Sequence, residues 1–149
     1  MEGGAMRCMF TAGVTDTLMK AGIDFDGAIG VSAGAAFGCN YKSRQIGRVL
    51  RYNVKYASDT RLSSWQSWLK TGDLYGADFC YHDLPVKLDI FDTVAFQKNS
   101  IDFWYVATDI NNGEAIYHKL ILGKEANLQW IRAFSSIPVF AQPVEIGSR

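Results

Sequence analysis

The sequence lacks the features that mark membrane-spanning, disulfide-bonded or nucleic-acid-binding proteins. No apolar run approaches the roughly 18 residues of a membrane span. Fifteen Lys and Arg residues balance fifteen Asp and Glu residues, so the overall charge carries no signature of binding to nucleic acid or to an anionic membrane. The three cysteines are an odd number without the spacing of a metal site, which favours reduced thiols in a cytoplasmic protein.

Length and composition are those of an ordinary globular domain. The 149 residues predict one domain, and a content of 48% hydrophobic residues can supply its core. The sequence contains no secretory signal pattern, internal repeat or low-complexity stretch. Function therefore has to be sought in local motifs.

The most informative motif surrounds Ser32. Gly30 and Gly34 flank it in a Gly-x-Ser-x-Gly pattern, which follows a short apolar run and precedes small residues suited to a closely packed helix. Strand, tight turn and helix are the setting in which this pattern forms a nucleophile elbow, with the serine hydroxyl exposed at a helix N-terminus. The alternative is that Ser32 only caps the helix. The strand-and-helix context favours the nucleophile.

A second glycine pair opens the chain. Gly3 and Gly4 precede a helical pattern over residues 9–21, which Gly22 is placed to end. Backbone N–H groups freed by such a pair can point at an anion, which beside a serine nucleophile would be the oxyanion of a tetrahedral intermediate. Arg7 adds positive charge at the same helix start. An ordinary glycine loop is the alternative interpretation.

Several stretches together resemble the patatin-like phospholipase family. The two specific ones are residues 2–7 (Glu-Gly-Gly-Ala-Met-Arg) and 30–35 (Gly-Val-Ser-Ala-Gly-Ala). Three further stretches corroborate them: residues 107–109 with 112–114, residues 131–133 with 135–138, and residues 143–147. The resemblance extends over nearly the whole chain and is weakest from about residue 52 to residue 98.

The resemblance implies an α/β fold, a three-layer α/β/α sandwich around a mainly parallel sheet. It also implies hydrolysis of acyl esters, including phospholipids, by a serine–aspartate dyad that needs no histidine, metal or organic cofactor. Ser32 would be the nucleophile. The backbone of Gly3, Gly4 and Ala5 would form the oxyanion hole, and Arg7 would lie nearby. Transient contact with a membrane surface is a further expectation.

The sequence departs from the family pattern in two ways. Cys8 follows the motif arginine where the family usually has glycine, so a thiol is expected to crowd the loop slightly. The dyad aspartate of the family lies in an Asp-Gly-Gly or Asp-Gly-Ala motif shortly after the stretch that matches residues 143–147. The chain has neither motif at a suitable position, because Asp26-Gly27-Ala28 precedes the nucleophile strand.

The apolar strand that precedes the glycine loop in the family is not found before Glu2 either. We therefore expect residues 1–149 to be a partial patatin-like domain, with the dyad aspartate beyond residue 149. On its own, this stretch is expected to be a poor hydrolase.

The middle of the chain predicts a helix capped by Ser43. Its solvated side would carry a basic stripe made of Arg44, Arg48, Arg51 and Lys55. Its apolar side would carry Ile46, Val49, Leu50 and Val54. Trp65, Trp68 and Leu69 follow at helical spacing. We interpret them as core or lid packing, with an interfacial lipid anchor as the alternative.

The C-terminal half turns to strand at residue 101. A hairpin is predicted at Asn112-Gly113, followed by a helix that Asn127 caps and Pro138 ends. Asp109 before the turn is the one internal aspartate that could replace the dyad base, although an Asx-turn is the favoured interpretation. Asp109 and His118 also fit the Ser–Asp–His order of an α/β-hydrolase triad. This alternative is disfavoured, because the two residues are predicted to lie on opposite arms of one tight hairpin.

A non-enzymatic alternative remains open at this point. Without a base, the glycine loop and the Ser32 turn could bind a phosphate or acyl group, or could transfer an acyl group to an acceptor other than water. A serine-reactive fluorophosphonate separates binding from catalysis, because it labels only an activated serine, and dependence on an acceptor separates acyl transfer from hydrolysis.

Overall fold

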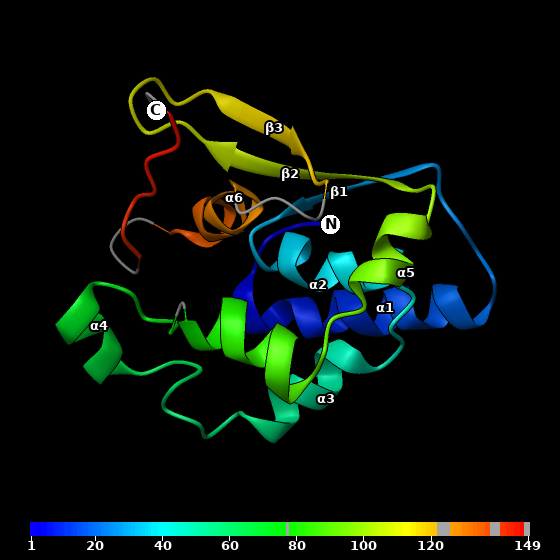
Figure 1. Ribbon diagram of the computed structural model, residues 1–149, viewed down its shortest axis with the longest axis horizontal. Coiled ribbons are helices and arrows are strands. Elements are labelled where there is room, and N and C mark those ends of the chain that lie inside the picture. The colour runs from blue at the N-terminus through cyan, green and yellow to red at the C-terminus, as the bar shows by residue number, and fades with distance from the viewer. Residues whose placement is uncertain (77, 122–125, 138–140, 148–149) are drawn as a thin grey trace.

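The computed structural model describes residues 1–76, 78–121, 126–137 and 141–147. Its elements in chain order (Figure 1) are η1 (Ala5–Cys8), α1 (Met9–Lys20), β1 (Gly27–Val31), α2 (Ala33–Lys42), α3 (Arg48–Lys55), α4 (Trp65–Thr71), η2 (Phe79–Leu88), α5 (Thr93–Lys98), β2 (Asp102–Thr108), β3 (Ala115–Lys119) and α6 (Ala126–Ser135). The first of these is a 3-10 turn, and η2 is a π-helical segment. Helices and strands are mixed along the chain, as expected for an α/β protein.

The described strands form one sheet in the order β1-β2-β3. β1 and β2 are parallel, with Ala28 opposite Phe103 and Gly30 opposite Tyr105. β2 and β3 are antiparallel and form the predicted hairpin, with Tyr105 opposite His118. The sheet therefore has one parallel and one antiparallel pairing among the described strands, and a mainly parallel sheet stays a prediction.

One face of the sheet carries the principal core. Phe103 and Tyr105 alternate inward along β2 with 0% and 3% of their surface exposed. They pack against Ala35 of α2, Phe96 of α5 and Phe134 of α6. All labelled helices lie on this side of the sheet (Figure 1). Because the labelled helices lie on one side of the sheet, the α/β/α order of the expected three-layer sandwich stays a prediction.

A second apolar cluster joins the helices beneath the sheet layer. Its buried members come from α1, α3, η2 and the segment before α4: Ala12, Val49, Tyr52, Tyr56, Leu62, Phe79 and Leu84. Phe37 of α2 packs against this cluster, while Ala35 belongs to the cluster under the sheet. Helix α2 thus lies between the two cores and is fixed from both sides.

The prediction that Ser43 begins a helix is wrong. Ser43 is instead the C-cap of α2, and its hydroxyl donates to the Asn40 carbonyl. Arg44 has a φ of 59°, so the chain leaves the helical conformation immediately afterwards. The next helix, α3, begins at Arg48 after Gly47.

Other local predictions agree with the structure in whole or in part. The first helix ends at Lys20, just before Gly22. The last predicted helix is present, but it begins at Ala126, so Asn127 lies inside it and is not its cap. The predicted stop at Pro138 lies outside the described residues. Cys8, Cys39 and Cys80 are all free. No helix of the described chain is long and apolar enough to cross a bilayer.

Candidate active site

Ser32 occupies a strained turn between a strand and a helix. It directly follows β1 and is the N-cap residue of α2, with φ 51° and ψ −127°. A non-glycine residue in this conformation costs roughly 1–3 kcal/mol, and such strain concentrates at functional sites. The side chain makes no capping hydrogen bond with α2. The alternative interpretation of Ser32 as a simple helix cap therefore lacks the hydrogen bond that would define it.

Glycine is required on both sides of Ser32 because backbones approach closely. A Cβ built on Gly30 would lie 2.7 Å from the backbone nitrogen of Ala35, so β1 and α2 could not come together with a side chain there. A Cβ on Gly34 would lie 2.6 Å from the Met1 carbonyl oxygen and closer still to that of Glu2. The two motif glycines thus allow the elbow to form and allow the N-terminal loop to reach it.

We expect Gly30→Ala to lower the free energy of unfolding by about 1–3 kcal/mol, because the clash is with backbone and cannot be relieved by a rotamer change. Gly13→Ala is the matched control, since a Cβ at Gly13 in α1 meets nothing within 4 Å. It should be neutral or stabilising by about 0.5–1 kcal/mol. Urea unfolding of both variants measures the difference, and equal stabilities would contradict the close approach.

The N-terminal glycine loop lies against the serine. A Cβ built on Gly3 would lie 3.0 Å from Cβ of Ser32 and 3.7 Å from its Oγ. The backbone of Met1 is joined to both sides of Gly30, because its N-terminus donates to the Ile29 carbonyl (2.6 Å) and its carbonyl accepts from the Val31 N–H (3.0 Å). These two bonds follow the pattern of a parallel ladder and fix the loop beside the elbow.

The loop itself has unusual backbone geometry. Gly4 has φ 157° and ψ 22°, and Ala5, the first residue of η1, has φ 47°. The Arg7 N–H donates to the Gly4 carbonyl at 3.0 Å, which closes the turn. The Arg7 side chain is also close, because a Cβ on Gly4 would lie 3.6 Å from its Nε. The structure thus places Gly3 beside Ser32 and Arg7 beside Gly4, while their roles in an oxyanion hole stay a prediction.

Cys8 does not crowd the loop in the way that its departure from the family pattern suggested. The side chain is buried, with 4% of its surface exposed, and its Sγ donates to the Glu2 carbonyl at 3.4 Å. Burial raises the pKa of the thiol above its ordinary value, so Cys8 is neutral at pH 7. The cysteine therefore supports the loop from beneath.

An apolar cavity of about 400 Å³ begins at Ser32 and passes between α2, η2 and α6. Ala5 and Met6 border it beside the serine. Its walls are mostly aromatic and aliphatic: Phe37, Tyr52, Leu62, Leu74, Leu84, Phe91, Tyr105 and Ile137. A larger opening of about 770 Å³, bordered by Asp26 and Asp102, lies at the opposite ends of β1 and β2, where it cannot serve Ser32.

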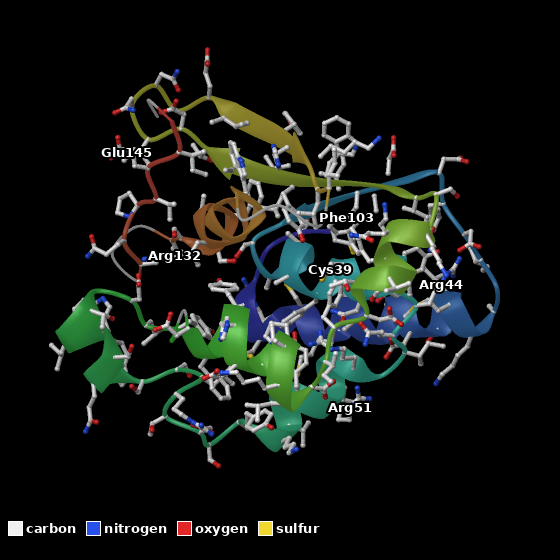
Figure 2. The ribbon with its side chains drawn as sticks, viewed as in Figure 1. Cys39, Arg44, Arg51, Phe103, Arg132 and Glu145 are labelled. Carbon is white, nitrogen blue, oxygen red and sulfur yellow. The ribbon has the colours of Figure 1, made fainter. Side chains whose placement is uncertain are left out.

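The thiols and the phenol of Tyr81 in the cavity walls are held neutral by burial. Burial raises the pKa of the Cys39 and Cys80 thiols to about 12, and that of Tyr81 also to about 12. Cys39 lies on α2 and Phe103 on β2, both between the sheet and the helices below it (Figure 2). With its thiols and phenols uncharged, the cavity suits an uncharged apolar group.

A family model for the patatin-like phospholipases matches residues 1–149, the whole chain. The chain belongs to the patatin-like phospholipase family. It is also 31% identical over 145 residues to "Uncharacterized protein YjjU" of Escherichia coli (strain K12). That match covers 93% of this chain and 39% of the relative, so the chain spans about two fifths of the length of that protein.

Membership of the patatin-like phospholipases makes this chain part of a family of lipid acyl hydrolases.

The alternative of a Ser–Asp–His triad, as in an α/β-hydrolase, is wrong for Asp109 and His118, the two residues that suggested it. His118 lies opposite Tyr105, four residues along β2 from Asp109, which is about 13 Å at the rise of a strand. Asp109 accepts from the Asn111 N–H at 2.9 Å in an Asx-turn, and His118 stacks on Trp130.

One residue of the basic stripe that was predicted to be solvated, Arg48, instead lines the cavity of this patatin-like domain. Arg48 is buried, with 4% of its surface exposed, and lines the cavity. Its guanidinium donates to Asn40 Oδ1 at 2.9 Å and to the Asp89 carbonyl at 3.1 Å. The available signal was its spacing of four residues from Tyr52, which places both residues on the buried face of α3.

A second polar group missed by the sequence analysis lies elsewhere in the cavity wall. Asp73 accepts from the Gln142 N–H at 2.8 Å and pairs with Arg132 of α6, whose Nη2 is 3.4 Å from Asp73 Oδ2. Figure 2 shows Arg132 on the side of α6 that faces the α4 region. The carboxylate thus ties three segments together. No signal in the sequence linked residues so far apart.

Proposed function

We propose that this protein is a serine acyl hydrolase that cleaves acyl esters of lipids through a serine–aspartate dyad. The observation that carries this proposal is the contact of the glycine loop with the strained serine, where a side chain at Gly3 would press against Ser32. The apolar cavity that begins at Ser32 supports an acyl chain as the bound part of the substrate. No metal or organic cofactor takes part.

The proposed reaction proceeds in two halves. Ser32 Oγ attacks the ester carbonyl carbon while the dyad aspartate takes its proton, and the carbonyl electrons move onto the oxygen. Backbone N–H groups of Gly4 and Ala5, with Gly3 beside them, stabilise that oxyanion. Collapse of the intermediate expels the alcohol, which receives the proton, and leaves an acyl-serine. Water then attacks the acyl-serine with the same aspartate as base, and the carboxylic acid is released.

The base itself is proposed to lie beyond residue 149. In the described residues, Asp73 is the carboxylate that lines the cavity, and its two oxygens already bind Gln142 and Arg132. Asp109 is likewise engaged in its Asx-turn. On this account residues 1–149 carry the nucleophile and the oxyanion hole of a longer patatin-like domain. We also place the protein in the cytoplasm, which three free cysteines support.

Hydrolysis of a short-chain nitrophenyl ester tests the proposal, and Gly4→Val tests the role assigned to the loop. Valine cannot readily adopt φ 157°, so the variant should misalign the N–H donors of Gly4 and Ala5. Loss of one such donor costs about 10²–10³-fold in kcat. KM should change little, since the oxyanion forms only in the transition state. A change confined to KM would instead assign the loop to substrate binding.

A further inference from the structure

The cavity that begins at Ser32 follows one side of helix α2. The residues of this helix that line the cavity are Ala33, Ala36, Phe37 and Cys39. Spacings of three residues place Ala33, Ala36 and Cys39 next to one another on the same side of the helix. Because Ser32 is the N-cap of α2, the cavity starts where the helix begins and continues toward its other end.

Arg48 lies at the far end of this path. Asn40 follows Cys39 in α2, and its Oδ1 accepts from Nη1 of Arg48 at 2.9 Å. Asn40 is eight residues after Ser32, a separation of about 12 Å at the rise of an α-helix. Arg48 itself lines the cavity, with 4% of its surface exposed. The path from the serine along α2 therefore ends at a buried guanidinium.

The guanidinium of Arg48 is held in place from several directions. Its Nε donates to the Asp89 carbonyl at 3.1 Å and lies 3.3 Å from Oδ1 of the same residue. Arg51 pairs with this carboxylate at 2.8 Å and holds the pKa of Asp89 below its ordinary value, so the carboxylate is charged at pH 7. The Arg48 guanidinium also lies over the rings of Tyr52 and Phe91, at 5.3 Å and 5.4 Å from their centroids. An apolar chain cannot displace these partners, because breaking a buried ion pair is strongly unfavourable.

The rest of the cavity wall is mostly apolar, so chain length should control affinity up to Arg48. A straight acyl chain should gain about fourfold in affinity for each methylene group that it buries there. The gain should stop at the guanidinium, because a methyl group cannot replace the polar partners that a buried charge requires. An extended chain advances about 1.25 Å per carbon at ordinary bond lengths, so about 12 Å holds about ten carbons.

We propose that Arg48 closes the far end of the acyl cavity and limits the acyl chain to about ten carbons. Arg48 would then be a residue that determines the specificity of the reaction at Ser32. This inference rests on the proposed function for the identity of the ligand, an acyl ester. Selection by length is a property of binding and requires no catalysis, so it can be measured separately from the chemistry.

Binding of straight-chain methyl esters to the Ser32→Ala protein measures the length limit without turnover. Isothermal titration calorimetry compares esters whose acyl chains have from about four to about fourteen carbons, a range that spans the expected limit. Kd should fall about fourfold per carbon up to about ten carbons and then level off. A Kd that keeps falling to the longest chain, or that does not depend on chain length, would overturn the inference.

Two substitutions at Arg48 separate its charge from its hydrogen bonds. Neither methionine nor lysine can reproduce the forked bonds of a guanidinium to Asn40 and Asp89, but only methionine removes the charge. In the Ser32→Ala background, Arg48→Met should move the levelling to chains about two or more carbons longer, while Arg48→Lys should keep it at about ten. The same profile in both variants would contradict a limit set by the charge.

Ala36→Leu tests the path along α2 while leaving the ion pairs intact. Ala36 lines the cavity four residues after Ser32, which is about 6 Å along the helix. A larger side chain there should make the affinity level off at about five carbons, and an unchanged profile would overturn the inference. Levelling at the expected length in a protein without esterase activity refutes only the proposed function. Esterase activity without levelling refutes only the role of Arg48.

Discussion

Replacing Ser32 by alanine should lower kcat for a short-chain nitrophenyl ester by about 10⁶-fold, the cost of removing the nucleophile in a serine hydrolase. The assay uses the chain together with the residues that follow 149 in its own coding sequence, so that the proposed base is present. Alanine removes only the hydroxyl, which makes no capping bond with α2, so the helix should be unaffected.

Ser58→Ala is the matched control, because Ser58 is exposed and does not line the cavity. Both variants should unfold at the same urea concentration as the parent, which separates loss of chemistry from loss of structure. Activity of Ser32→Ala within tenfold of the parent would mean that another group is the nucleophile.

The second large effect concerns the base. Residues 1–149 alone should hydrolyse the ester about 10⁴–10⁶-fold more slowly than the chain that continues past residue 149, because the aspartate of a dyad is itself the general base. The comparison is made at matched concentrations of folded protein, measured by circular dichroism. Changing the candidate aspartate to asparagine in the longer chain should reproduce the loss.

Comparable rates for the two chains would contradict this prediction. An internal carboxylate would then have to take the proton from Ser32. Asp73 would be examined first, because it lines the same cavity, and Asp109 next. Asp73→Asn and Asp109→Asn in the 149-residue chain would identify which of the two is required.

The parts of the site that could be predicted from the sequence are those fixed by local backbone demands. A Gly-x-Ser-x-Gly pattern between an apolar run and small residues is compatible with few structures other than a strand, a tight turn and a helix. All three are present around Ser32. The glycine pair at the N-terminus carried the same kind of information, since a side chain at Gly3 would press against Ser32 and Gly4 has φ 157°.

The parts that could not be predicted depend on contacts between distant segments. Arg48 was assigned to a solvated stripe because arginine is seldom buried, but Asn40 and the Asp89 carbonyl supply the partners that burial requires. The same holds for Asp73 and Gln142, which are separated in the sequence by η2, α5, β2, β3 and α6. Trp65 and Leu69 were predicted to be packed and are exposed, because helical spacing alone cannot show which side of a helix is covered.

The most direct test of the central claim is labelling of the protein with a fluorophosphonate, followed by mass spectrometry of its peptides. The account predicts a single phosphonylated residue, Ser32, in the folded chain that continues past residue 149, and no label in its Ser32→Ala variant. A label on any other residue, or none in the folded parent protein, would contradict the assignment of Ser32 as an activated nucleophile.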